Sequence, residues 1–293
     1  MKNYPLVTVV VPSYNHEKYI ASAIQSIIDQ DYENIELIVI DDGSRDDSVN
    51  IIRALIPLCE RRFKRFEFRS RPNKGLCRTL NEALDWSQGQ YFSATASDDM
   101  LDRCKVSAQV QAFFQKKANV WMVGVFAGLA MIDEQGKILR TRGRDESFGF
   151  REVMRRTAFM PGSAVMFVTE ALKQVGGYNP DYKIEDLYMA LKLSSLGGRF
   201  VSIKRPLVLY RRHDDNLSSK SDLIWEAVKK IIDDYHDHAL YRQGLAFSQL
   251  IQAHDVQGVS KKASFSWGWA AMKTYPLCVF SRSFVWWLTK FLR

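Results

Sequence analysis

Short hydrophobic runs alternate with helically spaced hydrophobic positions through the first hundred residues. The runs at 6–11 and 35–40 are rich in Val and Ile, which is typical of strands that are buried on both faces. Between them, residues 20–28 place Ile and Ala at the spacing of an amphipathic helix. The same reasoning predicts further strands at 66–68 and 91–95, and further helices around 49–55 and at 76–86. Strands that alternate with short helices predict an α/β fold with a mostly parallel, doubly wound sheet.

Polar residues follow three of the predicted strands at the point where each strand ends. Ser13 and Tyr14 come after the first strand, and Asp41 comes after the second. Asp98 and Asp99 follow the fourth strand. In an open α/β sheet the ligand lies outside the carboxyl ends of the strands. We therefore expect these groups to meet on one rim of the sheet.

The hydrophobic pattern becomes looser from residue 120 to 213. Apolar segments at 121–129 and 163–168 predict strands, and the segment 185–196 predicts a helix. No composition break precedes residue 213, so we expect a single domain over residues 1–218.

Composition and charge narrow the class of protein. Apolar residues make up 46% of the 293 positions and charged residues 25%, which is ordinary for a globular protein with a full core. The net charge of +8 favours an anionic partner, such as a phosphorylated substrate, an anionic membrane or a nucleic acid. We expect no secretory signal, because the first residues run straight into a strand-like segment, and we find no apolar run long enough to span a bilayer and no paired cysteine pattern. These features predict a cytoplasmic protein.

The adjacent carboxylates of Asp98 and Asp99 have two interpretations. At a strand end in a basic protein, they suit a hard divalent cation that also binds substrate phosphates. Such a cation would stabilise a diphosphate leaving group, on which negative charge accumulates. The alternative is a turn or a helix cap, where Asp is common.

Two other polar positions admit both a structural and a functional interpretation. Asp41 stands in the turn-forming sequence before Gly43 and Ser44, but its carboxylate could also accept hydrogen bonds from a base or a ribose hydroxyl. Arg71, in the next loop, could stack on a base or pair with a phosphate.

Candidate chemistry also occurs in the second half of the chain. Glu185 and Asp186 begin a predicted helix, where acidic residues favour the helix dipole but could also include a general base. His213 follows Arg211 and Arg212, so it could bind a metal or a phosphate, or be an ordinary loop residue.

Taken in order, these segments resemble glycosyltransferase family 2, the inverting enzymes of the GT-A fold. The resemblance covers about residues 5–218 and depends on the order and spacing of several short motifs. They are VVVPSYN at 9–15, ELIVIDDGS at 36–44, RPNKG at 71–75, the segment from GQY at 89–91 to SDD at 97–99, GGY at 176–178, ED at 185–186 and YRRH at 210–213.

The resemblance implies a GT-A (nucleotide-diphospho-sugar transferase) fold with a nucleotide-binding half at 1–100 and an acceptor and catalytic half at 101–218. It implies that a sugar moves from a nucleotide-diphosphate donor, expected to be a UDP-sugar, to a hydroxyl of a glycan or lipid-linked glycan. The expected setting is the synthesis of a bacterial surface polysaccharide, such as an O-antigen, capsule or exopolysaccharide.

The resemblance also implies roles for individual residues. Those expected to hold the nucleotide sugar are Pro12, Ser13, Tyr14, Asp41 and Arg71, with Asp98 near the ribose or the sugar. Asp99 is expected to bind Mn²⁺ or Mg²⁺, together with His213, and Asp186 is expected to be the general base. Many family members have an acid two residues before the paired aspartates, where this chain has Ala96, so the contacts to the sugar are expected to differ.

A basic, helical extension is predicted at residues 219–293. Residues 261–293 contain six Lys or Arg and no Asp or Glu. Near the end, one helical stripe consists of Phe284, Trp287, Leu288, Phe291 and Leu292, with Arg282, Lys290 and Arg293 toward the other face. A helix of about 20 Å is too short to cross a bilayer, so it would either lie in the membrane interface or pack on the domain. We expect peripheral attachment at the inner face of the cell membrane.

Two other classes of protein remain as alternatives. A sugar-nucleotide nucleotidyltransferase would also combine an α/β sheet with metal-binding carboxylates, but it usually has a glycine-rich phosphate loop, which residues 12–16 do not form. A non-catalytic basic module would bind a membrane or a nucleic acid. Carboxylates at the expected crevice would repel nucleic acid, so we expect no nucleic-acid partner.

Overall fold

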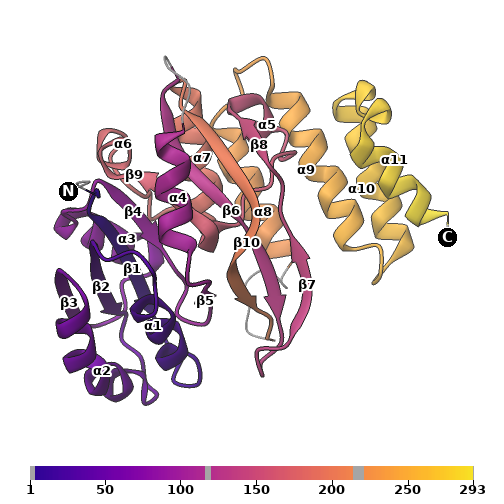
Figure 1. The fold of residues 1–293 in the computed structure, drawn as a ribbon. Helices are drawn as coiled ribbons and strands as arrows, with labels where there is room; N and C mark the ends of the chain where they lie inside the picture. The colour runs from indigo at the N-terminus through magenta and orange to yellow at the C-terminus, as the bar shows by residue number, and fades with distance from the viewer. Residues whose placement is uncertain (1–3, 116–119, 214–220, 293) are drawn as a thin grey trace.

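The computed structural model describes residues 4–115, 120–213 and 221–292. A mixed ten-stranded sheet runs through the molecule in the order β3-β2-β1-β4-β9-β6-β10-β5, with β7 on β6 and β8 on β10. Helices cover both faces, and the last three helices stand at the end of the molecule opposite β3 (Figure 1). The predicted α/β fold is confirmed.

The first half of the sheet is parallel and follows the sequence pattern closely. Its strands are β1 (Val7–Ser13), β2 (Ile35–Asp41), β3 (Arg65–Ser70) and β4 (Tyr91–Ala94), and its helices are α1 (Ile20–Ile28), α2 (Ser48–Arg62) and α3 (Leu76–Trp86). Every residue of β2 is buried, because α1 and α2 pack on one face of the sheet and α3 on the other. This explains why most of its side chains are apolar on both faces instead of alternating, while the buried Glu36 pairs with Arg65.

The second half mixes strand directions. It contains β5 (Met100–Leu101), α4 (Lys105–Phe114), β6 (Met122–Ile132), β7 (Ile138–Arg142), β8 (Glu146–Phe148), α5 (Phe150–Met154), η1 (Gly162–Ala164), β9 (Val165–Val168), α6 (Thr169–Gln174), α7 (Glu185–Ser195) and β10 (Arg199–Arg211). Strands β6 and β10 are parallel to each other, and β9 is antiparallel to both β4 and β6. The strand β9 therefore joins the two halves into one sheet.

The C-terminal helices are α8 (Ser221–Asp233), α9 (Tyr241–Asp255), α10 (Lys261–Thr274), η3 (Pro276–Phe280) and α11 (Arg282–Phe291). The expected boundary at residue 218 lies outside the described residues. Beyond it, Val228, Ile231 and Ile232 of α8 join the hydrophobic core formed by the sheet and α7. Only α9 to α11 build a cluster of their own, so α8 packs as part of the first domain.

Part of the stripe that was expected to face a membrane is buried inside this helical cluster. Phe284 is 9% exposed and Trp287 is 2% exposed, and Trp287 Nε1–H donates a hydrogen bond of 2.9 Å to Ser264 Oγ on α10. Gly268 makes room for the indole, since a Cβ there would lie 2.3 Å from the Trp287 ring. These two aromatic residues therefore pack on α10 instead of facing outward. None of the helices in the described ranges combines the length and apolarity needed to cross a membrane.

Candidate active site

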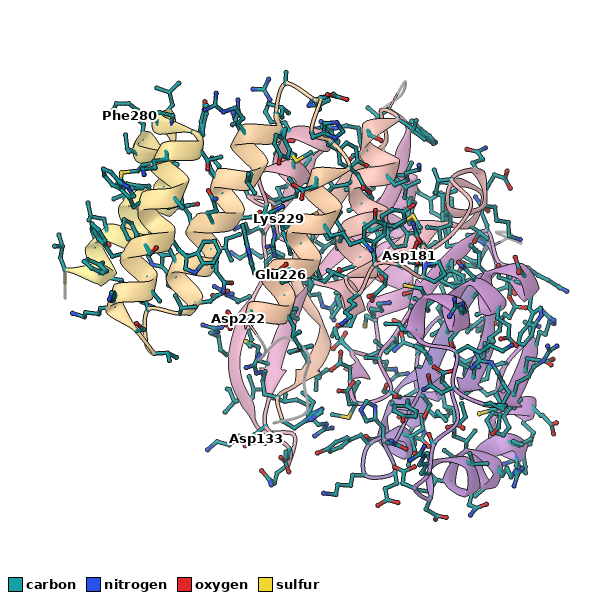
Figure 2. All side chains as sticks on the ribbon, turned by 180° about the vertical axis from the view of Figure 1, so that it is seen from behind. Asp133, Asp181, Asp222, Glu226, Lys229 and Phe280 are labelled. Carbon is teal, nitrogen blue, oxygen red and sulfur yellow. The ribbon has the colours of Figure 1, made fainter. Side chains whose placement is uncertain are left out.

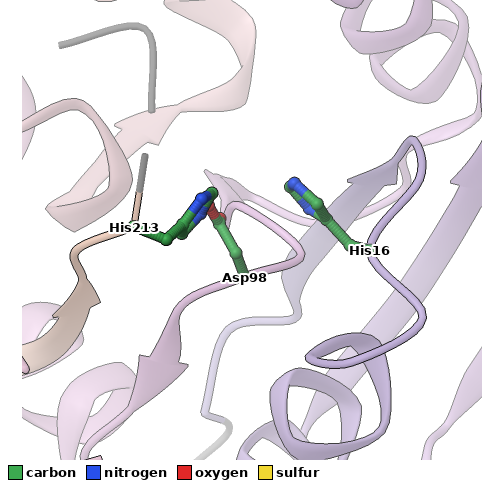
Figure 3. A group of neighbouring side chains, drawn as sticks. All are labelled: His16, Asp98 and His213. Carbon is green, nitrogen blue, oxygen red and sulfur yellow. The ribbon is translucent and has the colours of Figure 1, made fainter. Parts of the chain in front are cut away.

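The loops after β1, β4 and β10 bring three potential metal ligands together (Figure 3). They are His16, Asp98 and His213, whose ligand atoms all lie within 4.8 Å of one another. Asp98 Oδ2 lies 2.9 Å from His213 Nε2, and Ser97 Oγ lies 2.7 Å from His16 Nδ1. These residues are 82 and 115 positions apart in sequence, so only the shared rim of the sheet can bring them together.

The donor set fits a divalent transition metal. One carboxylate oxygen and two imidazole nitrogens are ligands typical of a divalent transition metal, whereas Mg²⁺ prefers oxygen ligands alone. The His213 and Asp98 side chains are largely buried, with exposed fractions of 7% and 11%, so a cation there would be shielded from bulk water.

The expected roles of the adjacent aspartates do not fit this geometry. The structure brings Asp98, and not Asp99, against His213. One oxygen of Asp99, Oδ1, accepts the Arg211 backbone N–H at 2.9 Å. The side chain of Arg211 fixes the same loop by donating to the Asp98 carbonyl at 3.0 Å and to carbonyls at the tip of the β6–β7 hairpin, where Asp133 lies (Figure 2). Asp98 is therefore the aspartate that pairs with His213, and the expected metal role of Asp99 stays a prediction.

Asp99 nevertheless carries a strongly perturbed carboxyl group. Burial raises the pKa of Asp99 to about 8, and the neighbouring Asp98 charge adds to this rise. The Arg211 N–H, the Ser163 side chain and the Arg211 charge oppose the rise without cancelling it. A cation near Asp98 would favour the charged form of such a group.

Three buried polar atoms around this rim have no hydrogen-bond partner within the described ranges. They are Ser13 Oγ after β1, Thr95 Oγ1 after β4, and Asp99 Oδ2. Buried polar groups in folded proteins are nearly always satisfied, so a cluster of unsatisfied ones needs an explanation. A polar ligand at the rim would supply the missing partners.

Asp41 and Arg71, both expected to hold the nucleotide, are occupied by the protein itself. The Asp41 carboxylate is fully buried and accepts the backbone N–H groups of Gly43 and Ser44 at 3.2 and 3.1 Å, as well as the Ser44 hydroxyl. The Arg71 guanidinium pairs with Asp42 and donates to Glu82 at 3.0 Å and to Thr79 Oγ1 at 2.8 Å. Both residues therefore shape the loops beneath the rim, and the geometry does not support a direct Arg71–nucleotide contact.

The loop that contains Pro12, Ser13 and Tyr14 remains available to a ligand. Tyr14 is 44% exposed and Pro12 is half-buried, so both reach the surface of the rim. The loop is held in place by the next residue, Asn15, which has a left-handed backbone with φ of 54°. Its side-chain oxygen accepts the Arg45 N–H at 2.8 Å, which ties the loop after β1 to the loop after β2.

Glu185 and Asp186 occupy the first turn of α7, and both are half-buried. Burial raises the pKa of Asp186, against the effects of the Leu187 N–H, which donates to its Oδ1 at 2.7 Å, and of Arg156. Burial and the Asp186 charge raise the pKa of Glu185 to about 8. A carboxylate with a raised pKa is a better proton acceptor near neutral pH.

The short turn η1 lies between Asp186 and the rim. A Cβ built at Gly162 would lie 2.7 Å from Asp186 Oδ2, so only a glycine allows this close approach. The next residue, Ser163, has its side chain beside the Asp99 carboxylate. Adjacent residues of one turn thus lie against both carboxylates, which brings Asp186 close to Asp99.

His16 and Arg156 were missed by the sequence analysis. His16 directly follows the Ser-Tyr-Asn loop, so the rule that polar residues after strands meet on one rim could have included it. Arg156 has a left-handed backbone with φ of 52°, and its charge acts on Asp186. Nothing in the local sequence indicates either property of Arg156.

Comparison with known families places these observations in context. The model of "Glycosyl transferase family 2" matches residues 8–176, a segment that includes His16, Asp98 and Asp99. The chain is 28% identical over 238 residues to a chondroitin synthase of Escherichia coli, an alignment that covers 80% of this chain. It spans only 33% of that synthase and less than half of the length of two further bacterial relatives.

Two solved structures share the fold. A mannosyltransferase of Pyrobaculum calidifontis, in complex with GDP-Man and Mn²⁺, superimposes with a TM-score of 0.62 at 16% identity, covering 99% of this chain and 85% of its own. Residues 1–349 of S. aureus TarS, in complex with UDP-GlcNAc, give a TM-score of 0.62 at 18% identity, covering 98% and 80%. At this identity the likeness supports the fold alone.

Proposed function

The chain belongs to glycosyl transferase family 2, and from this premise we propose that it transfers a sugar from a nucleotide-diphosphate donor to an acceptor hydroxyl with inversion. The observation that carries the proposal is the rim itself. A buried carboxylate and two imidazoles converge where three strands end, beside buried polar atoms without partners in the described chain. One relative is a chondroitin synthase, whose product is a polysaccharide. We therefore propose that this chain also acts in polysaccharide synthesis, at the bacterial surface.

Asp98 and His213 are proposed to hold a divalent cation, with His16 within reach. The nitrogen donors favour Mn²⁺ over Mg²⁺. When bound, such a cation offsets the negative charge that builds up on a departing diphosphate. Asp99, buried behind Asp98, holds the Arg211 backbone and so positions the loop that carries His213.

Asp186 is proposed as the general base. It stands across η1 from the rim, in a site where burial raises its pKa. Taking the proton from the acceptor hydroxyl on the side opposite the leaving diphosphate gives direct displacement and hence inversion at the anomeric carbon. Glu185 shares this turn, and burial together with the Asp186 charge raises the pKa of Glu185 to about 8.

The donor is proposed to be a UDP-sugar. The complexes of the two structural neighbours contain a UDP-sugar in one case and a GDP-sugar in the other, so the base must be identified by experiment. Pro12, Ser13 and Tyr14 are proposed to contact the nucleotide, since this loop alone among the expected segments leaves an unpaired hydroxyl and an exposed ring at the rim.

Peripheral membrane attachment is proposed through the outward side of the last helices. Phe280 is 85% exposed and Leu292 76% exposed, and Phe280 lies at the outer end of the helical cluster (Figure 2). The nearby cations Lys273, Arg282 and Lys290 match an anionic lipid surface. The contact residues differ from the expected stripe, because Phe284 and Trp287 are buried.

The test of the activity is to incubate the full-length protein with a panel of UDP- and GDP-sugars and Mn²⁺ and to measure release of the nucleoside diphosphate. Release from one donor that stops when the metal is chelated is the expected result. Failure with every donor, or release that is unchanged in excess chelator, contradicts the proposal.

A further inference from the structure

A strongly cationic groove lies on the acceptor half of the molecule, away from the rim. Its volume is about 730 Å³, and three separate segments line it: residues 141–144 at the end of β7, residues 156–159 after α5, and residues 204–206 in β10. Five of the lining side chains are basic, namely Arg142, Arg144, Arg156, Lys204 and Arg205. We call this feature the basic groove.

The backbone explains why these residues face one space. β10 departs from regular pairing with β6 between Ile203 and Val208, and Pro206 stands in this irregular stretch. Glycine residues allow the strands to approach there, since a Cβ at Gly143 would lie 2.0 Å from the Lys204 carbonyl oxygen. The irregular stretch thus sets Lys204 and Arg205 beside the end of β7.

Most of the positive charge in the basic groove is not balanced by nearby acids. Arg205 pairs with Asp102 at 3.2 Å, but the other four cations have no ion pair within the described residues. The neighbouring acids are engaged with backbone instead: Asp145 accepts the Lys204 N–H at 2.7 Å, and Glu146 accepts the Phe159 N–H at 2.8 Å.

Mutual repulsion and burial act on these guanidinium groups. Partial burial and the charges of Arg140 and Arg144 lower the pKa of Arg142. Burial lowers the pKa of Arg156, although Asp186 and Asp255 partly oppose this. An anion in the groove would relieve both effects, because it would pair with charges that now face one another.

Arg156 connects the basic groove to the proposed base. Its φ of 52° is a left-handed conformation that residues other than glycine rarely adopt, and such conformations cluster at functional sites. The conformation follows the end of α5, where the Arg156 N–H donates to the Val153 carbonyl at 2.9 Å. From there the side chain lines the groove while its charge acts on Asp186.

We propose that the basic groove binds a phosphate or diphosphate group of the acceptor and so presents the acceptor hydroxyl to Asp186. Several arginines around one small space match a compact, multiply charged anion, and the guanidinium fork pairs with phosphate oxygens in a bidentate manner. A single sugar carboxylate carries only one charge and would leave most of the groove unpaired. The inference rests on the proposed function, since it names the acceptor of that reaction.

The test is calorimetric titration of full-length, metal-free protein with inorganic pyrophosphate in metal-stripped buffer. When no divalent cation is present, the carboxylates of the rim repel pyrophosphate. Binding of pyrophosphate therefore reports on the basic groove. We expect one site that weakens as salt is added. In Arg142→Gln/Arg144→Gln, affinity is expected to fall about tenfold or more, because each lost contact is a charge-assisted hydrogen bond.

A matched control removes the same charge elsewhere. Arg53→Gln/Arg61→Gln changes two exposed arginines of α2 and is expected to bind pyrophosphate like the wild type. Equal affinity of the groove variant and the control, or no binding by the wild type, overturns the inference. Binding of a glucuronate-containing oligosaccharide to the groove in place of pyrophosphate overturns the assignment to phosphate.

Two further measurements keep the result interpretable. Arg156→Gly removes a charge while keeping a residue that accepts positive φ, so a folded variant with unchanged pyrophosphate affinity also counts against the inference. Binding of UDP with Mn²⁺ to the wild type is measured separately. If UDP and Mn²⁺ do not bind while pyrophosphate still binds to the basic groove, the proposed donor is wrong and the proposed anion site is supported.

Discussion

The rim and the basic groove are both charged, but their charges are arranged in opposite ways. At the rim, Asp98 and His213 are largely buried, and the carboxylates of Asp41 and Asp42 are satisfied by loop backbone. In the groove, Arg142, Arg144 and Lys204 are exposed and have no ion pair in the described chain. The rim is preorganised around a fixed geometry, whereas the groove offers charge that an incoming anion can pair with.

This difference suggests a division of labour between the two halves. A reaction that moves a sugar needs a rigid site at the leaving group, because stabilisation of developing charge depends on fixed geometry. Recognition of an acceptor tolerates more freedom and depends on long-range attraction. Variants that change one region and leave the other intact test this division.

Replacing the proposed base should have the largest effect on turnover. Asp186→Asn keeps the shape of the side chain but cannot take a proton, so kcat is expected to fall by about 10²–10⁴-fold. Binding of UDP and Mn²⁺, measured by calorimetry, should stay close to that of the wild type, because the change lies across η1 from the rim. Turnover like that of the wild type in purified Asp186→Asn contradicts the assignment.

Removing the carboxylate of the rim should impair donor binding as well as turnover. Asp98→Ala is expected to reduce kcat by about 10²–10³-fold, the usual loss when a group that stabilises leaving-group charge is removed. It should also weaken Mn²⁺ binding, which distinguishes it from the base variant. Ala96→Ser, which changes a neighbouring residue of the same loop, serves as the control. Metal affinity that is retained in Asp98→Ala but lost in this control would show that Asp98 does not bind the cation.

Glu185 should make stability depend on pH. Its folded-state pKa of about 8 lies above the usual value of 4.5, so the folded state binds more protons than the unfolded state between these values. The free energy of unfolding therefore decreases as the pH rises through that window. Glu185→Gln removes this contribution, so its melting temperature should exceed that of the wild type at pH 9 and match it near pH 4. If the melting temperatures of the two proteins depend on pH in the same way, the raised pKa of Glu185 is contradicted.

The smallest effect is expected at the membrane surface. Phe280→Ser/Leu292→Ser removes two exposed apolar side chains and should lower partition to anionic liposomes by about tenfold, given the usual gain from burying such groups. Phe114→Ser, which changes another exposed residue on α4, serves as the control. Equal flotation of the two variants with the liposomes would argue against attachment through the last helices.

The first half of the fold could be predicted from sequence because local pattern and tertiary environment agree there. The helix at Leu76–Trp86 occurs as expected, and the strands β1 and β2 differ from the predicted runs by only a residue or two. Parallel strands covered on both faces are apolar throughout, so short Val- and Ile-rich runs identify them. Within the predicted helical extension, residues 221–255 form two helices, α8 and α9, and apolar spacing alone does not mark the break between them.

The second half was harder to predict for physical reasons. β7 has the sequence ILRTR and is exposed along its whole length, so it shows no alternation between core and solvent. β10 is irregular around Pro206, a residue that normally argues against a strand. The basic groove is formed by residues of both strands, so it could not be predicted from the sequence. The sequence shows only a general excess of positive charge.

The candidate site was predicted at the level of the rim but not at the level of individual atoms. The rule for strand ends predicted that the loops after β1 and β4 meet, and His16 and Asp98 in these loops lie close together. It could not say which of two adjacent aspartates faces His213, because neighbouring side chains point in different directions and the choice depends on Arg211 from β10. It also could not show that Arg71 is held by Asp42 and Glu82, a pairing between three separate segments.

Pulsed electron paramagnetic resonance of Mn²⁺ bound to the full-length protein with UDP tests most directly whether Asp98 and His213 hold the cation. We expect nitrogen couplings from imidazole that diminish in His213→Gln, together with weaker Mn²⁺ binding in Asp98→Ala. Mn²⁺ that binds with UDP and shows no imidazole nitrogen coupling in the wild type would contradict the proposed cation site.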